Sequence, residues 1–196
     1  MSDLPACVYT DGGVIGPNPS PQGGVWAYCW IDHQGQRSHR ASGLVRPRGI
    51  GLPTVTNNVT ELLAVLLALE GLPDDWSGIV HTDSFVTLSR FRRDRNSTSF
   101  KGIPESLVKR TLRVRRKGQY GMRLVAGHPT SAELARGCKG NTPTSPHNVW
   151  CDRECGRRIA QFRQCGFCPG LNADDAGGVQ TCVAAQMACA PLDCPA

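Results

Sequence analysis

The sequence predicts a mixed α/β domain with a partly parallel sheet, followed by a cysteine-rich C-terminal segment. Three strand-like runs come first, and helical and strand-like runs then alternate, which is typical of such a sheet. The end of the chain differs, because residues 165–196 contain five cysteines and no lysine or arginine. We therefore expect a domain over residues 1–164 and an appendage over 165–196 that either lacks fixed structure or is held by a metal.

The first three strands are expected at 6–10, 24–31 and 37–44. The first is a β-prone run that ends at Asp11, before a Gly-Gly pair, and a turn-rich segment separates it from the second. Gln34 and Gly35 indicate a hairpin turn between the second strand and the third.

The stretch 59–69 is apolar almost all the way round and rich in leucine and alanine, which predicts a buried helix. We expect this helix to begin at Asn57 or Asn58 and to stop at Gly71. A final helix is expected to open at Ser145-Pro146, where serine can cap and proline suits the first turn. Between them we expect a strand at 78–82, helices at 84–92 and 104–116, a strand at 120–126 and a Gly/Pro/Thr-rich insertion at 137–146.

Length and composition exclude several classes of protein. The 196 residues are enough to bury a core, and no run reaches the ~18–20 apolar residues of a membrane span. The first residues lack the layout of a signal peptide, and the uneven spread of the cysteines argues against a secreted disulfide scaffold. We expect a cytoplasmic monomer with reduced thiols and no membrane partner.

The net charge of +6 is unevenly distributed along the chain. Between Arg90 and Arg123 there are twelve basic residues and two acidic ones, so this segment carries +10 and the rest of the chain carries −4. A basic surface on a mildly acidic body indicates a polyanionic partner, most simply nucleic acid. The alternative is an ordinary solvated helical face.

Four acidic residues stand where one sheet can gather them. Asp11 and Asp83 follow strands that would bring both carboxylates to the same edge if they are parallel neighbours. Glu61 lies in the first two turns of the apolar helix, and Asp152 lies about two turns into the last helix. Carboxylates that converge without basic partners repel one another, and Mg²⁺ or Mn²⁺ relieves that repulsion with hard oxygen ligands.

Each acid also has an ordinary structural interpretation. Asp11 can be a turn residue, and Glu61 can close a capping box with Asn58. Asp83 with the following serine can cap the next helix, and Asp152 can be a surface residue. We prefer the site because all four occur together at positions that a single sheet can gather.

Several motifs, in order, resemble ribonuclease H of type 1. They are Thr10-Asp11-Gly12-Gly13, Thr56-Asn57-Asn58-Val59-Thr60-Glu61-Leu62, Thr82-Asp83-Ser84, Gly127-His128-Pro129 and Cys151-Asp152. The resemblance covers about residues 6–162, and the Thr-Asn-Asn-x-x-Glu-Leu segment is its most specific part. It implies a ribonuclease H-like mixed five-stranded sheet with helices on both faces.

The resemblance also implies an activity. Asp11, Glu61, Asp83 and Asp152 would hold two Mg²⁺ or Mn²⁺ ions and cut the RNA strand of an RNA–DNA hybrid, leaving a 5′-phosphate and a 3′-hydroxyl. His128 matches a family histidine that shuttles a proton or helps the product leave. Between His128 and Asp152 this chain has more residues than the usual family form.

The resemblance further implies substrate contacts. Gly12, Asn18 and Asn57 match positions that touch the RNA strand, where neutral amides and backbone groups read a 2′-hydroxyl. A basic protrusion would grip phosphates of the DNA strand, and its matching residues here are Arg110, Arg113, Arg115, Arg116 and Lys117. Phe85 stands where many members have a glutamine that contacts substrate, and the loop before Asn18 carries an extra residue.

The cysteines leave two interpretations open. The spacing of Cys151, Cys155, Cys165 and Cys168 can hold a structural Zn²⁺, with Cys138 and His147 as further candidate ligands. The interpretation that we favour is unpaired reduced thiols, with Cys151 as a packing residue.

Two other functions are compatible with parts of the pattern. One is a ribonuclease H-fold nuclease with another substrate, and the other is a non-catalytic module that binds hybrids or duplexes. The second predicts the loss of at least one of the four acids, and all four are present.

Overall fold

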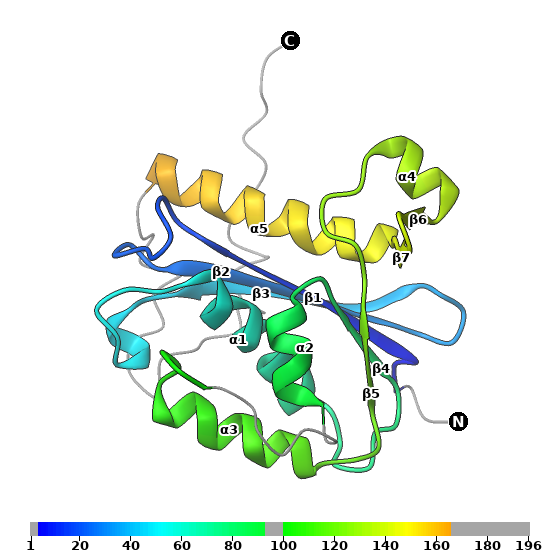
Figure 1. Cartoon of the computed structure of the whole chain (residues 1–196), viewed down its shortest axis with the longest axis horizontal. Helices are drawn as coiled ribbons and strands as arrows, with labels where there is room; N and C mark the ends of the chain where they lie inside the picture. The colour runs from blue at the N-terminus through cyan, green and yellow to red at the C-terminus, as the bar shows by residue number, and fades with distance from the viewer. Residues whose placement is uncertain (1–3, 93–99, 166–196) are drawn as a thin grey trace.

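The computed structural model describes residues 4–92 and 100–165, with only the backbone of Cys165, and contains a five-stranded sheet of order β3-β2-β1-β4-β5 (Figure 1). The strands are β1 (Cys7–Val14), β2 (Gly24–Ile31), β3 (Arg37–Val45), β4 (Ile79–Thr82) and β5 (Gly121–Leu124). β1, β2 and β3 pair antiparallel, whereas β4 lies parallel to both β1 and β5. The predicted mixed sheet with a parallel portion is confirmed.

Helices cover both faces of this sheet, as predicted (Figure 1). The helices α1 (Asn57–Glu70), α2 (Phe85–Phe91) and α3 (Glu105–Arg116) lie on one face, and α5 (Pro146–Cys165) lies on the other. A short 3₁₀ helix, η1 (Arg48–Ile50), precedes α1. None of the helices in the described part of the chain has the length and apolar character to cross a bilayer.

Two apolar layers hold these elements together. In the first, α1 lies between the sheet and α3, which is why ten of its fourteen residues are buried, among them Leu62, Leu63 and Leu66. In the second, Cys151 and Cys155 of α5 pack against residues of β2. The nearly uniform apolar character of α1 therefore reflects contacts on two sides rather than one.

The first strand is longer than expected. Asp11 was expected to end it, but β1 continues to Val14 and stays paired with β2 across the Gly12-Gly13 pair. The expectation is wrong because these glycines are strand residues at a crowded position rather than a turn: a Cβ on Gly12 would lie 2.5 Å from the backbone nitrogen of Glu61. The parallel pairing with β4 stops at Thr10, so Asp11 is the first residue beyond it.

The insertion before the last helix has structure of its own. A short helix, α4 (Ser131–Arg136), precedes a hairpin of β6 (Cys138–Lys139) and β7 (Thr142–Pro143). Thr130 and Glu133 form a reciprocal capping box at the start of α4. This helix was not expected from the sequence, although the Thr-x-x-Glu pattern that begins it is a recognised helix start.

The predicted helix starts are otherwise confirmed. The Ser84 side chain accepts a hydrogen bond from the backbone nitrogen of Thr87 and caps α2. α1 begins at Asn57, and α5 begins at Pro146, after Ser145 accepts a bond from the backbone nitrogen of His147. The expected appendage lies, from residue 166 onward, outside the described residues.

Candidate active site

Three of the four predicted acids meet at one edge of the sheet. Asp11 comes from β1, Asp83 follows the neighbouring strand β4, and Glu61 comes from the second turn of α1. One carboxylate oxygen of each lies within 4.8 Å of the others. Parallel neighbours place the residues after them at a common edge, and this is the juxtaposition that the sequence predicted.

The electrostatics of this cluster are unfavourable for three ionised groups. Burial, followed by the charges of Asp83 and Asp152, raises the pKa of Asp11 to about 8. Burial, followed by the charges of Asp11 and Asp83, raises the pKa of Glu61, and burial is also the main reason that the pKa of Asp83 is raised. None of the three forms an ion pair with a cation in the described part of the chain.

Some oxygens of the cluster lack a hydrogen-bond partner. Oδ1 of Asp11 accepts a bond of 2.8 Å from the backbone nitrogen of Gly12, whereas Oε2 of Glu61 and Oδ1 of Asp83 are buried and unpartnered. Buried polar atoms are normally satisfied, so unpartnered oxygens that converge in this way indicate a ligand. Carboxylate oxygens at this spacing fit hard divalent cations such as Mg²⁺ or Mn²⁺.

The fourth acid and the histidine line the same cavity. This cavity has a volume of about 500 Å³, and its walls include Asp152 of α5 and His128 as well as the three clustered acids. Nδ1 of His128 lies 3.3 Å from Oδ1 of Asp152, and the His128 side chain is 78% exposed. The histidine therefore stands at the mouth of the cavity, with a carboxylate behind it.

A tight steric contact, a left-handed backbone angle and two hydrogen bonds define the loop that carries His128. A Cβ on Gly127 would lie 2.5 Å from Oδ2 of Asp83, so only glycine fits beside that acid. His128 itself has a φ of 45° in the left-handed region. Nζ of Lys139, on the hairpin, donates bonds of 3.1 and 3.2 Å to the carbonyl oxygens of Gly127 and His128. Lys139 was not expected to have this role, because nothing in the local sequence pattern points to it.

Two of the ordinary structural interpretations of the acids, those of Asp11 and Glu61, do not match the structure. Asp11 lies within β1 rather than in a turn. The N-cap of α1 is Thr56, without a side-chain capping bond, so Glu61 closes no capping box with Asn58. The Asp83-Ser84 pair does begin α2, as that interpretation expected, and Ser84 is the residue of the pair whose side chain caps the helix.

The expected RNA-contact residues lie beside the acids. Gly12 and Asn57 line the cavity. Oδ1 of Asn18 accepts a bond of 3.3 Å from the backbone nitrogen of Asn57, so the loop after β1 is tied to the start of α1. Phe85 is exposed at the first position of α2, directly after the Ser84 cap.

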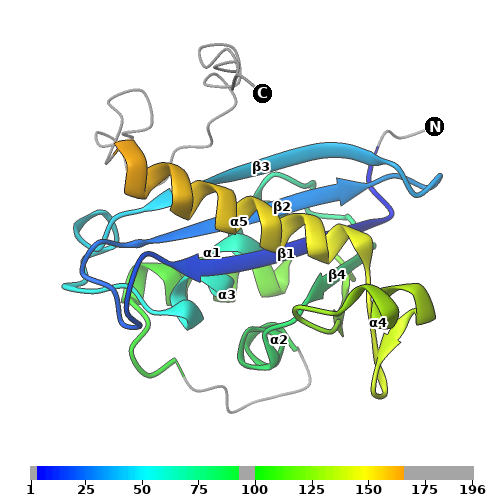
Figure 2. The ribbon, with the colours of Figure 1, turned by 90° about the horizontal axis from the view of Figure 1, so that it is seen from above.

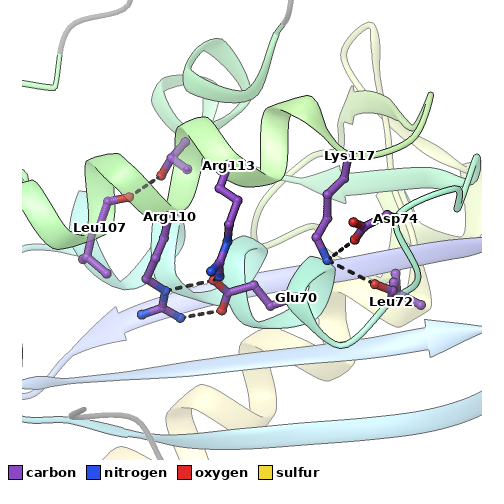
Figure 3. Close-up of polar contacts among 8 residues, drawn as sticks. Glu70, Leu72, Asp74, Leu107, Arg110, Arg113 and Lys117 are labelled. Atoms are coloured by element: carbon purple, nitrogen blue, oxygen red, sulfur yellow. Dashed lines mark hydrogen bonds and ion pairs between the residues drawn. The ribbon is translucent and has the colours of Figure 1, made fainter.

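The expected DNA-contact residues divide into two groups (Figure 3). Arg110 turns toward α1 and forms two bonds, of 2.9 and 2.6 Å, with the carboxylate of Glu70, and Arg113 adds a third of 2.9 Å. Nζ of Lys117 lies 2.9 Å from Oδ1 of Asp74 and also donates to the carbonyl oxygen of Leu72. These bonds hold α3 and the residue after it against the end of α1 and the loop that follows, so Arg110, Arg113 and Lys117 already have partners within the protein.

The remaining two residues of the basic set differ in exposure, since Arg115 is half-buried and Arg116 is exposed. Arg115 donates a bond of 2.9 Å to the carbonyl oxygen of Arg92, and Arg116 is exposed at the end of α3. Arg113 keeps 66% of its side chain exposed while it contacts Glu70, whereas Arg110 keeps 25%. Arg113 and Arg116 are therefore the residues of this set best placed to meet a polyanion.

The predicted zinc ligands do not converge. Cys151 and Cys155 are buried under α5, where the sulfur of Cys151 lies 3.9 Å from that of Cys29. α5 continues without a break to Cys165, ten residues and about 15 Å of helix beyond Cys155. The four-cysteine site is therefore wrong as proposed, and Cys168 lies outside the described residues. Cys138 is a free thiol, and neither it nor His147 belongs to any metal-binding group in the described ranges.

Comparisons with known proteins point to a single family. The RNase H family model matches residues 4–156. The chain is 30% identical over 152 residues to the ribonuclease H of Nitratidesulfovibrio vulgaris strain DP4, which covers 78% of this chain and 87% of that protein, and it matches the ribonuclease H of the Hildenborough strain equally well.

Solved structures agree on the fold. The crystal structure of LC11-RNase H1 in complex with an RNA/DNA hybrid superposes with a TM-score of 0.54 at 17% identity, covering 79% of this chain and 96% of that one. The N-terminal RNase H domain of Rv2228c from Mycobacterium tuberculosis gives a TM-score of 0.53 at 14% identity, covering 81% and 97%.

Proposed function

Because this chain belongs to the ribonuclease H family, we propose that it cuts the RNA strand of RNA–DNA hybrids with two divalent ions, leaving 5′-phosphate and 3′-hydroxyl ends. The observation that carries the proposal is the cluster of Asp11, Glu61 and Asp83, whose oxygens lie within 4.8 Å of one another. Two of these residues also have a buried oxygen without a partner. A non-catalytic binding module would have no use for a cluster that is unfavourable without cations.

The metal ligands in this proposal are the four acids. Asp11, Glu61 and Asp83 would hold Mg²⁺ or Mn²⁺ together with Asp152, which lines the same cavity. When bound, such ions activate a water molecule and stabilise the charge that develops on the phosphodiester oxygens. The protein supplies the anchorage, since each ligand comes from a different element of a rigid core.

His128 and Asp152 form the proton-handling pair of the proposal. The carboxylate of Asp152, 3.3 Å from Nδ1, orients the imidazole ring, which leaves Nε2 for the leaving 3′ oxygen or for the departing product. The exposed position of His128 suits a group that acts at the mouth of the cavity.

Recognition of the two strands is assigned to different surfaces. Asn57 and Gly12 line the cavity, where an amide and a backbone group can hydrogen-bond a ribose 2′-hydroxyl. The exposed ends of Arg113 and Arg116 would contact phosphates of the DNA strand, while Arg110 fixes the helix that carries them. The protein in the LC11-RNase H1 crystal structure is bound to an RNA/DNA hybrid, which is the substrate class proposed here.

We further propose that the protein acts as a cytoplasmic monomer. Among the residues that the structure describes with their side chains, Cys7, Cys29, Cys138, Cys151 and Cys155 are unpaired thiols, as expected in a reducing compartment.

A cleavage assay tests the proposal. A hybrid with an end-labelled RNA strand should be cut in the presence of Mg²⁺, and the Asp83→Asn variant should lose on the order of 10³-fold in rate, because about 4 kcal/mol of charge stabilisation depends on the intact ligand set. The same sequence as an all-DNA duplex is the control. Failure to cut the hybrid, or cutting that Asp83→Asn leaves unchanged, would refute the proposal.

A further inference from the structure

A second basic surface lies on the other flank of α5, away from the four acids. A groove of about 170 Å³ runs between the edge strand β3 and α5, and its walls include Arg40, Trp150, Arg157 and Arg158. The catalytic cavity is lined by other residues of the same helix, Asp152, Gly156 and Ile159. With 3.6 residues per turn, these two sets fall on opposite sides of α5.

Two arginines of β3 reach the Trp150 ring because the strand is irregular, and one of them, Arg40, also lines the groove. The register between β2 and β3 shifts at Trp30/Ile31, so that His39 pairs with Trp30 but Arg37 pairs with Ile31. Arg37 and Arg40, which are three residues apart, therefore both project from the α5 side of the sheet, as a bulge allows. Their guanidinium carbons lie 6.0 and 5.7 Å from the centre of the Trp150 ring.

The positive charge of this surface is only partly neutralised. Glu154 accepts bonds from both Arg157 and Arg158 and one from Ser42, so a single carboxylate serves two arginines. Arg37 and Arg40 are exposed and form no ion pair with any residue in the described ranges. Four guanidinium groups thus surround one indole ring and one carboxylate.

This chemistry fits an unpaired nucleic-acid strand. Guanidinium groups bind phosphates in a bidentate way, and unpaired bases stack both on aromatic rings and on the planes of arginine side chains that lie over such rings. A duplex would present stacked bases that cannot reach an indole within a groove of this size. An acidic peptide would use the arginines but would gain nothing from the ring.

The position of the groove connects it with the cavity. Seen from above, α5 crosses the sheet over β1 and β2, with β3 along one side and β4 and α4 along the other (Figure 2). A strand that leaves the cavity reaches the groove after crossing a single helix, about 10 Å wide. The outer surface of α5 is open there, since Arg153 and Gly156 are exposed and a Cβ on Gly156 would meet nothing within 4 Å.

We propose that the Arg37–Arg40–Trp150 groove binds a single-stranded extension of the substrate as it leaves the catalytic cavity. The proposal rests on the proposed function in that it takes a hybrid as the substrate. It goes further in assigning a second contact that only substrates with an unpaired end can use.

The test compares three hybrids that share the same duplex: one blunt, one with a 5′ extension of the RNA strand and one with a 3′ extension. Binding of the full chain is measured by fluorescence anisotropy with metal chelated, over a range of salt concentrations. The Arg37→Gln/Arg40→Gln variant should bind one of the extended hybrids about tenfold more weakly than the unmodified protein does. The slope of log binding constant against log salt concentration should become shallower by about 1.4, which corresponds to the loss of two single-strand phosphate contacts. Its affinity for the blunt hybrid should change by less than about twofold.

Controls separate the groove from general electrostatics and from misfolding. Arg48→Gln removes another exposed arginine, from η1, and should not weaken binding of the extended hybrids more than binding of the blunt one. Arg40→Gln alone, which leaves Arg37 over the ring, should show a smaller loss in the same direction. Thermal unfolding by circular dichroism reports whether each variant is folded.

Other results would overturn the proposal. They are an equal loss on blunt and extended hybrids, unchanged affinity for both extended hybrids, or a polyglutamate peptide that competes as well as the extension does. Cleavage of the blunt hybrid with Mg²⁺ is measured separately, so the absence of cleavage would refute the proposed function whereas cleavage without an extension effect would refute only the groove.

Discussion

The two ends of α1 carry one glutamate each, and the two side chains have opposite surroundings. Glu61, in the second turn, is buried beside Asp11 and Asp83, and its pKa is raised by burial and by those charges. Glu70, at the last residue, is also partly buried, and burial alone would raise its pKa. The hydrogen bonds and charges of Arg110 and Arg113 outweigh that effect and lower it.

The difference shows how one helix serves two purposes. At Glu70 the opposite charges come from α3, so the cluster is satisfied by the protein itself and fastens two helices together. At Glu61 the neighbours are like charges, so the cluster becomes favourable only when a cation from solution joins it. A paired carboxylate supports the fold, and an unpaired one beside other acids provides a site.

The largest expected effect comes from replacing the carboxylate of Glu61, near the N-terminal end of α1, by an amide. Glu61→Gln should lower the rate of hybrid cleavage on the order of 10³-fold, because it removes a metal ligand. The same variant should make the metal-free protein more stable by about 1 kcal/mol, because a buried like charge is removed. Cleavage assays and urea unfolding in a chelator measure the two effects.

The same change at the other end should have the opposite pattern. Glu70→Gln leaves Arg110 half-buried without a carboxylate and should cost about 2 kcal/mol of unfolding free energy, in the range for hydrogen bonds to charged groups. Activity at saturating substrate should fall by less than about threefold, since no catalytic group is touched.

The matched control is Glu105→Gln. Glu105 forms an i,i+4 pair with Lys109 in which both side chains are largely exposed, so urea unfolding should show no measurable change. If Glu70→Gln is no more destabilising than this control, the attachment of α3 to α1 does not depend on the cluster.

The acidic site could be predicted from the sequence for a local reason. Asp11 and Asp83 each follow a run whose pattern predicts a strand, and Glu61 interrupts a run whose pattern predicts an apolar helix. The position of each acid on its element could therefore be predicted from the residues next to it in the chain. The resemblance supplied the remaining step, which is that these elements meet. The structure brings three of the acids together and places Asp152 and His128 on the same cavity.

The pairing of the basic residues could not be predicted in this way. The partner of Arg110 is Glu70, 40 residues away, and a count of charges does not reveal which of them are already neutralised. The same limitation concealed the groove on α5, because Arg37 and Arg40 are distant in sequence from Trp150 and belong to the part of the chain that sums to −4.

The fold was predictable where the elements were long. The order of strands and helices was correct, whereas β1 was taken to be too short because Gly12-Gly13 suggested a turn. The six-residue helix α4 was overlooked because its apolar pattern is too brief to show a period.

The pH dependence of stability sharpens the comparison between the two glutamates. Asp11 has a pKa of about 8 in the folded protein and an ordinary value of 3.8, so the folded state binds more protons between these values. Stability of the metal-free protein should therefore fall as pH rises from 7 to 8.5, by roughly 1 kcal/mol or 2–4 °C in Tm. Glu70 does not contribute in this range, because its lowered pKa leaves it ionised in both states.

Added Mg²⁺ should reverse this trend, since the ion binds ionised carboxylates and stabilises the folded state more as pH rises. Thermal melts with chelator and with Mg²⁺ at each pH measure both curves. Asp11→Asn should flatten the metal-free curve, and a slope that survives this substitution would assign the pH dependence to other groups.

The smallest expected effect concerns the exposed side of the acidic cavity. Lys139→Gln removes the bonds to the carbonyl oxygens of Gly127 and His128, so the imidazole should be held less firmly and kcat should fall about threefold with KM unchanged. His128→Ala should cost more, about 10²-fold, because the proton-handling group itself is lost. If Lys139 acts only through His128, the double variant should be no slower than His128→Ala alone. An additional loss in the double variant would mean that the Lys139 charge acts on the substrate directly rather than by holding the loop.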